Sequence, residues 1–501
     1  MMPRNNQDKV YDIIGYAPDA DPATPGACST LTNVYRTTRG WRAAPVPKDM
    51  SSIVSTVGPG TITDSVMRMD YTPYGSIGND IGALIINTVG KIYRYSVDYG
   101  LSDISRTAGY GTAVSQLQPM DVKTTSAGVF IARGPNIPVQ KFAFGGVCTD
   151  ITGSLSAGVL IESNRFMLAF NAAIPAATYA ADRWICSARD DYENWVLSPT
   201  TLCATGRLPP DAILGALRLG DDVYAFTLKT TWVGRFVPGS PEVWVWARAP
   251  FDMGAMGVLG RMLGVEYKRG IIWLAPEGLM YWDGAQLVNL MDQRLRRWFS
   301  ENVSTVQMYF DPASIAYDVE RDTIWLTFKT LAAGRKTLLI QPETRAWSEW
   351  THQDLTYLAS APDPGPSSSI YAPYTPKLRS VVWSLGSTIV PTVRPVPLDA
   401  TATPSHTANM VLNDFGGVYT DSELTGLELK FVTPPTTAYA VGLTRNNLED
   451  GLETASPTIA RASDGSFHFR QNARWHRADI KLTGDFEVIG YALEATQTGL
   501  R

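Results

Sequence analysis

The chain has 501 residues, with 43 Lys and Arg against 48 Asp and Glu, so its formal net charge at pH 7 is −5. Proteins dedicated to DNA or membrane surfaces normally carry a basic excess, so this balance argues against both classes and leaves room only for a local basic patch. No apolar run reaches the ~18 residues of a membrane span, and the start MMPRNNQDKVYDIIG lacks the apolar core of a signal peptide. We therefore expect no membrane segment and no export.

The chain opens with residues 1–40, which are polar and rich in turn residues (NNQDK, PDADPATPG) and predict an N-terminal arm. From residue 41 to residue 396 a module recurs about every 50 residues. It consists of an apolar strand, a short Gly/Asp/Asn turn, an aromatic-rich strand and then a Trp or Tyr. Copies begin near Ala83, Val129, Arg165, Asp222, Ile271, Asp322 and, more weakly, Val381.

This spacing predicts an all-β protein, a β-propeller of about six to eight blades. Each copy is a small antiparallel sheet that cannot bury both faces alone, and packing between blades solves that problem. The 42 Gly and 33 Pro supply the turns, and the aromatic content of 10% suits half-buried sheet faces.

Sustained helical spacing occurs once, in residues 285–303 (AQLVNLMDQRLRRWFSENV), which predict one amphipathic helix inserted between blades. Its arginines Arg294, Arg296 and Arg297 form the strongest local basic feature of the chain. Three interpretations stand: a solvated or internally paired face, a subunit or ring interface, and contact with passing DNA. Arg296 points away from the side shared by the other two, so a continuous DNA-binding stripe is not predicted.

The segment of residues 361–376 (APDPGPSSSIYAPYTP) is too rich in Pro and Ser for regular structure. A surface loop is one interpretation, and a loop that gates a channel is the other. The gating candidates are Pro362, Pro364, Gly365 and Pro366.

Residues 397–501 start as a Thr/Pro/Ala/Ser-rich linker and continue as a C-terminal β-rich block. Within it, RADIKLTGDFEVIGYAL gives two alternating runs joined by Thr483, Gly484 and Asp485, which predicts a hairpin. We expect this block to close the propeller ring together with the N-terminal arm, since closure removes exposed sheet edges.

No catalytic constellation, cofactor motif or metal-ligand set emerges. The histidines His352, His406, His468 and His476 lack ligand spacing, and Cys28, Cys148, Cys186 and Cys203 lack CxxC spacing, which suggests reduced thiols of a protein folded in the cytosol. For His476 we expect a strand residue with local hydrogen bonds, the alternative being an interfacial or pH-responsive role.

Three further features bear on a glycan-directed interpretation. Asp190, Asp191 and Glu193 resemble a carboxylate set for glycoside hydrolysis, although a solvated turn is the simpler reading. Ser96, Asp98 and Gly100 match part of the hairpin-forming box of sialidases, which has no catalytic role. The tryptophans are expected mostly in packing between blades, with subunit contact and sugar binding as alternatives: Trp244, Trp246, Trp273, Trp282, Trp347 and Trp350.

A family resemblance rests on several phrases in a fixed order. The ending NARWHRADIKLTGDFEVIGYALEATQTGLR resembles the Arg-Tyr-His-Arg hairpin and Gly-aromatic run of tail nozzle, or tail hub, proteins of short-tailed bacteriophages, with Trp475 in place of the usual Tyr. Further matching phrases are LTNVYRTTRGWRAAP, IYRYSVDYGLSDISR, RWICSARDDYENWVLSP, GIIWLAPEGLMYWDG and RRWFSENV.

The resemblance implies a virion component without enzymatic activity. It would be a propeller subunit in a ring, a homohexamer, below the portal and its adaptor, docking fibres or spikes while genomic DNA passes through the lumen without sequence-specific binding. Assembly in the cytoplasm of the host bacterium and a final location in the virion tail follow from the same resemblance. The alternative is a monomeric propeller that binds or cleaves glycans in receptor recognition, and oligomeric state separates the two.

Overall fold

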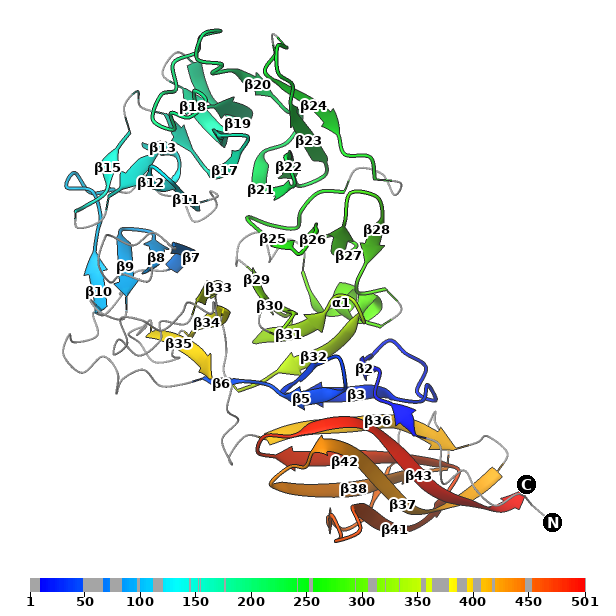
Figure 1. Ribbon diagram of the computed structural model, residues 1–501. Coiled ribbons are helices and arrows are strands. Elements are labelled where there is room, and N and C mark those ends of the chain that lie inside the picture. Colours follow the sequence, from blue (N-terminus) through cyan, green and yellow to red (C-terminus); the bar gives the residue numbers. More distant parts are fainter. Residues whose placement is uncertain are drawn as a thin grey trace.

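The computed structural model describes residues 10–500 except 48–65, 73–82, 97–99, 111–119, 144–145, 152, 154, 175–176, 241, 252–255, 293, 305–312, 320, 333, 353–356, 363–377, 385–393, 400–406, 417–419 and 447–452. Two bodies form this part of the chain, a ring of blades and a β-sandwich beside it (Figure 1).

The ring is a β-propeller of seven four-stranded antiparallel blades, so the predicted fold class is confirmed. The first strand of each blade lies next to the axis, and neighbouring first strands pack in sequence around it until β33 meets β7.

The strands of blades 1 to 4 are β7 (Val66–Thr72), β8 (Ala83–Thr88), β9 (Ile92–Ser96) and β10 (Gly100–Asp103); β11 (Asp121–Thr125), β12 (Gly128–Ala132), β14 (Gln140–Phe142) and β15 (Thr149–Asp150); β17 (Val159–Ser163), β18 (Phe166–Ile174), β19 (Ala177–Cys186) and β20 (Thr205–Arg207); and β21 (Ile213–Leu219), β22 (Asp222–Thr227), β23 (Thr231–Phe236) and β24 (Trp244–Arg248). Two short strands, β13 (Gly134–Pro138) and β16 (Ser156–Ala157), extend blade 3 beside β18.

The strands of blades 5 to 7 are β25 (Gly264–Tyr267), β26 (Gly270–Ala275), β27 (Gly278–Trp282) and β28 (Leu287–Asn289); β29 (Ser314–Asp318), β30 (Thr323–Lys329), β31 (Arg335–Gln341) and β32 (Ala346–Trp350); and β33 (Tyr357–Pro362), β34 (Leu378–Ser384), β35 (Arg394–Asp399) and β6 (Val46–Pro47).

The seven predicted copies coincide with the second strands of the seven blades, from β8 at Ala83 to β34 at Val381. The second strand is sandwiched between neighbouring blades, which explains its apolar sequence: all six residues of β26 and all five of β12 are buried. The first strands border the axis and are less uniformly apolar. The repeat therefore reports the apolar second strand, which in blades 2 and 5 is fully buried.

The β-sandwich joins the two ends of the described chain. One sheet contains β4 (Val34–Arg36), β5 (Trp41–Ala43), β43 (Glu487–Leu500), β37 (Thr420–Thr433) and β41 (Ser466–Ala473), with β1 (Tyr11–Asp12) beside β43. The other contains β3 (Ala27–Thr32), β36 (Thr407–Gly416), β42 (Trp475–Thr483) and β38 (Thr437–Arg445), with β2 (Gly15–Tyr16), β39 (Thr454–Ala455) and β40 (Ile459–Ala460) at its sides.

Ring closure differs from the sequence-based expectation. The closing strand is β6, whose Val46 and Pro47 pair with Asp399 and Leu398 of β35 in blade 7. The C-terminal block does not close the ring, because its strands find partners in the N-terminal arm and directly after it: Leu412 pairs with Cys28, and Val488 with Trp41. In a complete sandwich the N-terminal segment and the C-terminal block bury their apolar faces against each other. A single strand added to a blade would leave these faces exposed.

The sandwich and blade 6 share one sheet. Strand β3 runs parallel to β32, with Thr32 opposite Glu349, and the sheet continues from β29 through β32 into the sandwich. At this junction Asn33 holds a left-handed backbone (φ 60°), and its amide N donates to the Glu349 carbonyl at 2.7 Å. Its side chain bonds the Thr351 hydroxyl and amide and the Thr407 carbonyl. The propeller and the sandwich are therefore fastened by backbone and side-chain bonds.

Candidate functional site

Arg296 and Arg297 begin a helix much shorter than expected, and Arg294 lies just before it. Helix α1 covers Arg296–Asn302, whereas Leu287–Asn289 forms β28, the outer strand of blade 5. The expectation of one helix over residues 285–303 is therefore wrong in extent. Apolar residues at spacings of three and four also fit the outer strand and its connection, where Leu290, Met291 and Leu295 pack into the core.

Each of these arginines has a partner within the chain. Arg294 donates to the Arg345 carbonyl, Arg296 lies 3.7 Å from Asp292, and Arg297 lies 2.8 Å from Glu301. Burial lowers the pKa of Arg294, with a smaller contribution from Arg345. The side chains of Arg296 and Arg297 remain largely exposed, so contact with a neighbouring subunit or with DNA stays a prediction.

The N-terminal arm caps this helix. The Asp19 carboxylate accepts hydrogen bonds from the amides of Arg297 and Trp298 at 2.6 and 2.9 Å. The Asp19 amide in turn donates to the Arg294 carbonyl at 3.1 Å. The arm thus satisfies helical N–H groups that no residue of the helix itself caps. The predicted basic surface is thereby fixed to the N-terminal arm.

The gating candidates fall at the edge of the described structure. Pro362 is the last residue of β33, the first strand of blade 7. Pro364, Gly365 and Pro366 lie outside the described residues. The gating interpretation therefore stays a prediction.

The phrase Arg474–Trp475–His476–Arg477, which carries much of the resemblance, crosses between the two sheets of the sandwich. Arg474 lies 3.7 Å from Asp421 of β37. His476 is 1% exposed, and its Nε2 contacts the Ser422 carbonyl at 2.9 Å and the Ser422 hydroxyl at 3.1 Å. Burial lowers the pKa of His476, partly offset by bonds to backbone groups at Ser422 and Ala473.

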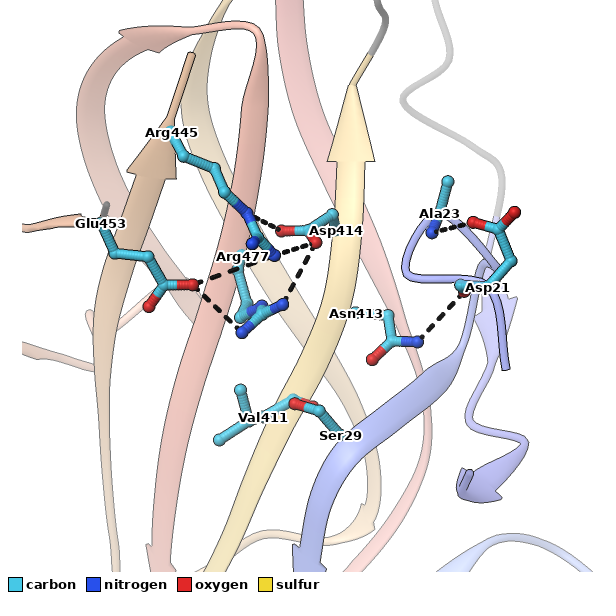
Figure 2. Close-up of polar contacts among 9 residues, drawn as sticks. All are labelled: Asp21, Ala23, Ser29, Val411, Asn413, Asp414, Arg445, Glu453 and Arg477. Atoms are coloured by element: carbon cyan, nitrogen blue, oxygen red, sulfur yellow. Dashed lines mark hydrogen bonds and ion pairs between the residues drawn. The ribbon is translucent and has the colours of Figure 1, made fainter. Parts of the chain in front are cut away.

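Arg477 belongs to a four-residue ion network (Figure 2). The buried Asp414 carboxylate accepts from Arg445 Nε at 3.2 Å and from Arg477 Nη2 at 3.1 Å. Glu453 lies 3.1 Å from Arg477 and 3.9 Å from Arg445. The Asp414 side chain is fully buried, and those of Arg445 and Arg477 are 10% and 19% exposed. Two positive and two negative groups from β36, β38, β42 and the segment entering β39 thus neutralise each other.

Neighbouring polar contacts tie this network to the arm (Figure 2). Asn413 Nδ2 donates to the Asp21 carbonyl at 3.4 Å, and the Ser29 hydroxyl donates to the Val411 carbonyl at 3.4 Å. The prediction that the two strands joined by Thr483, Gly484 and Asp485 form a hairpin is wrong in its pairing. Strand β42 pairs with β36 and β38, and β43 pairs with β37, so the two strands lie in opposite sheets of the sandwich. Asp414, which lies 63 residues from Arg477, and Glu453 are each separated from Arg477 by several strands, and no local signal marks such a pairing.

Two of the three carboxylates considered for glycoside hydrolysis are paired with basic side chains. Asp190 is paired with Arg165, and Glu193 with Lys141. Asp190, Asp191 and Glu193 lie on an exposed turn of blade 3. Among the described residues, no group of three or more His, Cys, Asp or Glu side chains is placed to hold a metal ion.

The tryptophans lie where packing between blades was expected. Trp244, Trp273, Trp347, Trp282 and Trp350 are buried, and Trp246 is half-buried between Phe170 and Trp184, with ring centroids 5.7 and 5.6 Å away. The four cysteines are free and buried, and burial raises the pKa of each thiol. In the described part of the chain, no helix has the length and apolar character needed to cross a membrane.

Seven blades around one axis define the class of this protein, a β-propeller with an attached β-sandwich. No protein-family model matches the chain, and no curated protein matches it. Among solved structures, Hsv2 of Kluyveromyces marxianus is 12% identical with a TM-score of 0.29, over 58% of this chain and 98% of that one.

Two further structures show the same level of similarity. A protein of Bacteroides fragilis described as a putative 6-phosphogluconolactonase is 10% identical with a TM-score of 0.33, over 67% of this chain and 95% of that one. Puromycin hydrolase is 11% identical with a TM-score of 0.36, over 78% of this chain and 61% of that one. At these values the comparisons extend to the fold and carry no argument about function.

Proposed function

We propose that this protein is a structural component of a short-tailed phage particle, the ring-forming nozzle or hub of the tail. In this role a homohexamer extends and closes the DNA channel below the portal and its adaptor and offers docking surfaces to fibres or spikes. It would assemble in the host cytoplasm and stay in the virion. The proposal assigns it no catalysis.

One observation carries the proposal: two of the phrases that resemble the family, at opposite ends of the sequence, form one structural unit. LTNVYRTTRGWRAAP supplies the end of β3 and all of β4 and β5, and the C-terminal phrase supplies β42 and β43. They pair directly, since Trp41 lies opposite Val488 and Arg42 forms an ion pair with Asp485 at 3.1 Å. A resemblance that converges on one module in space is stronger support than scattered phrases.

The junction with blade 6 suits a mechanical role. Blade 6 and the sandwich share a hydrogen-bonded sheet, and Trp350 Nε1 also donates to the Pro45 carbonyl at 3.0 Å. A subunit in a channel wall must transmit load between its parts without opening. A continuous sheet does this better than a flexible linker.

The test is the mass of the purified protein, alone and mixed with portal–adaptor rings, by native mass spectrometry or particle imaging. The proposal expects a six-fold ring, alone or on that template. A monomer that ignores the rings at every concentration would reject it. Binding of that monomer to a sugar array would then favour the glycan-directed propeller.

A further inference from the structure

A cavity of about 280 Å³ lies on the β-sandwich at the start of β38. Its wall combines the turn before β38 with β40 and the residues after it, and it includes Thr436, Tyr439 and Arg461. Strands β38 and β40 meet here, because Tyr439 lies opposite Ala460. The cavity is just smaller than the ~300 Å³ at which pockets for drug-sized ligands begin, so it has room for one ring-sized group.

Arg461 is held at the wall of this cavity without being neutralised. Its Nε donates to the Gly465 carbonyl at 3.2 Å, and its guanidinium lies 5.0 Å from the centre of the Phe431 ring. A carbonyl and an aromatic ring fix the side chain but carry no formal charge. Within the described part of the chain Arg461 forms no ion pair, whereas five other half-buried arginines of the sandwich each do: Arg36, Arg42, Arg445, Arg474 and Arg477. The charge of Arg461 is therefore available to an anionic ligand.

A second cation shares the surface beside the cavity. Lys481 of β42 lies opposite Tyr439, so the two side chains project from one face of the sheet with their Cβ atoms about 5 Å apart. Tyr439 is 42% exposed, and Lys481 is exposed and, among the described residues, forms no ion pair. The next pair on this face is Thr437 and Thr483, whose hydroxyl oxygens are 2.5 Å apart.

The strand order places these groups around the exposed ring. Strand β38 lies between β42 and β40, so Tyr439 has Lys481 on one side and the segment that carries Arg461 on the other. An acidic neighbour, Asp479, lies two residues before Lys481 on the same face. Burial raises the pKa of Asp479, an effect that the charge of Lys481 partly offsets. The surface thus combines two cations, one aromatic ring and hydroxyl groups.

We propose that this surface binds an acidic sugar, with the sugar carboxylate on Arg461 and Lys481 and the apolar face of the sugar ring against Tyr439. Guanidinium and ammonium groups form charge-assisted hydrogen bonds with carboxylates, and the Thr437 hydroxyl can bond the hydroxyls of the sugar. Tyrosine offers an apolar ring face together with a polar tip. The volume of the cavity suits one sugar ring better than an extended acidic peptide. The inference goes beyond the proposed tail role and applies to a ring and to a monomer.

Saturation-transfer NMR titrations on the purified full chain test the site. The probes are sodium glucuronate, which has both a carboxylate and a sugar ring, glucose, which lacks the carboxylate, and acetate, which lacks the ring. Glucuronate should bind saturably and at least about tenfold more tightly than glucose or acetate. Its affinity should fall as the NaCl concentration rises, because part of the attraction is between exposed charges.

Two variants locate the sugar on this surface. Arg461→Gln should weaken glucuronate binding about tenfold or more, and Lys481→Gln should weaken it by a smaller factor. Because Lys481 is exposed, its substitution preserves the packing of the sandwich and keeps the test valid if Arg461→Gln disturbs its turn. The matched control is Arg470→Gln on β41, which removes an exposed cation that does not line the cavity and should leave the affinity unchanged.

Several results would overturn the acidic-sugar site. Glucuronate that does not bind saturably, or that binds both variants as tightly as the parent, would show that this surface holds no acidic sugar. Acetate binding as tight as that of glucuronate would reduce the surface to a simple anion site, and equally tight glucose binding would remove the role of the two cations. Each of these outcomes leaves the tail proposal standing, because the mass of the assembly tests that proposal separately.

Discussion

The propeller and the sandwich are both built from antiparallel strands, but they recruit those strands from different distances along the chain. Within blades 1 to 6, paired strands lie close to one another along the chain. In the sandwich, Cys28 pairs with Leu412 and Trp41 with Val488. Strand pairing in the blades thus follows the local sequence pattern. Strand pairing in the sandwich requires that segments from both ends of the described chain come together. Substitutions at the polar contacts of the sandwich should therefore have the larger consequences.

The largest effect is expected from Asp414→Ala. It removes the buried acceptor of Arg445 and Arg477 and leaves Glu453 as their remaining partner, at a cost of about 3 to 5 kcal/mol of unfolding free energy. Chemical denaturation gives the free energy, and hydrogen exchange should show the loss in β36, β38 and β42 with blades 2 to 4 unchanged. The matched control is Glu301→Ala, whose exposed pair with Arg297 should not shift the denaturation midpoint. Equal effects of both variants would contradict the prediction.

Asn33→Ala should weaken the junction between the two bodies by about 2 to 4 kcal/mol. Alanine loses the side-chain bonds to Thr351 and Thr407 and adopts the left-handed backbone less readily. Asn33→Asp keeps an acceptor for the Thr351 amide and tolerates this backbone, so its loss should be smaller. Separate melting of sandwich and propeller in Asn33→Ala, seen by calorimetry, would show that the shared sheet couples them. A single unchanged transition would argue against that coupling.

Asp19→Ala should cost about 1 kcal/mol, since it removes the cap that the arm provides to α1. Hydrogen exchange at the amides of Arg297 and Trp298 should accelerate, with little change in the sandwich. Asp19→Asn retains one acceptor oxygen and serves as the control. Unchanged exchange in Asp19→Ala would mean that the arm does not hold the helix.

The smallest effect concerns pH. Burial lowers the pKa of His476 from its ordinary value near 6.5, so the unfolded chain binds the proton first. The contribution of His476 to the free energy of unfolding is complete above about pH 6.5. It decreases as the pH falls below this value, by at most about 1.4 kcal/mol per pH unit. In His476→Gln that part of the slope should vanish, which denaturation at pH 5 to 7.5 measures. A slope that persists in the variant would assign it to other groups.

The sequence revealed the blades because an apolar second strand, fully buried in β12 and β26, recurs from blade to blade. It also indicated that Trp273 and Trp347 belong to the core, since large aromatic side chains among apolar residues are usually buried. It overestimated the helix before Asn302, because the spacing of apolar residues in β28 and its connection imitates a helical face.

By itself, the sequence determined the all-β propeller, the existence of strands β42 and β43 and the polar character of the arm, since each depends on neighbours along the chain. Only the tertiary structure decided that β6 closes the ring, that both ends of the described chain form one sandwich, and that Asp414 pairs with Arg445 and Arg477. These choices depend on which distant segments bury each other's apolar faces and neutralise each other's charges. A local sequence period does not specify which distant strands pair, because such pairing depends on how the whole chain packs.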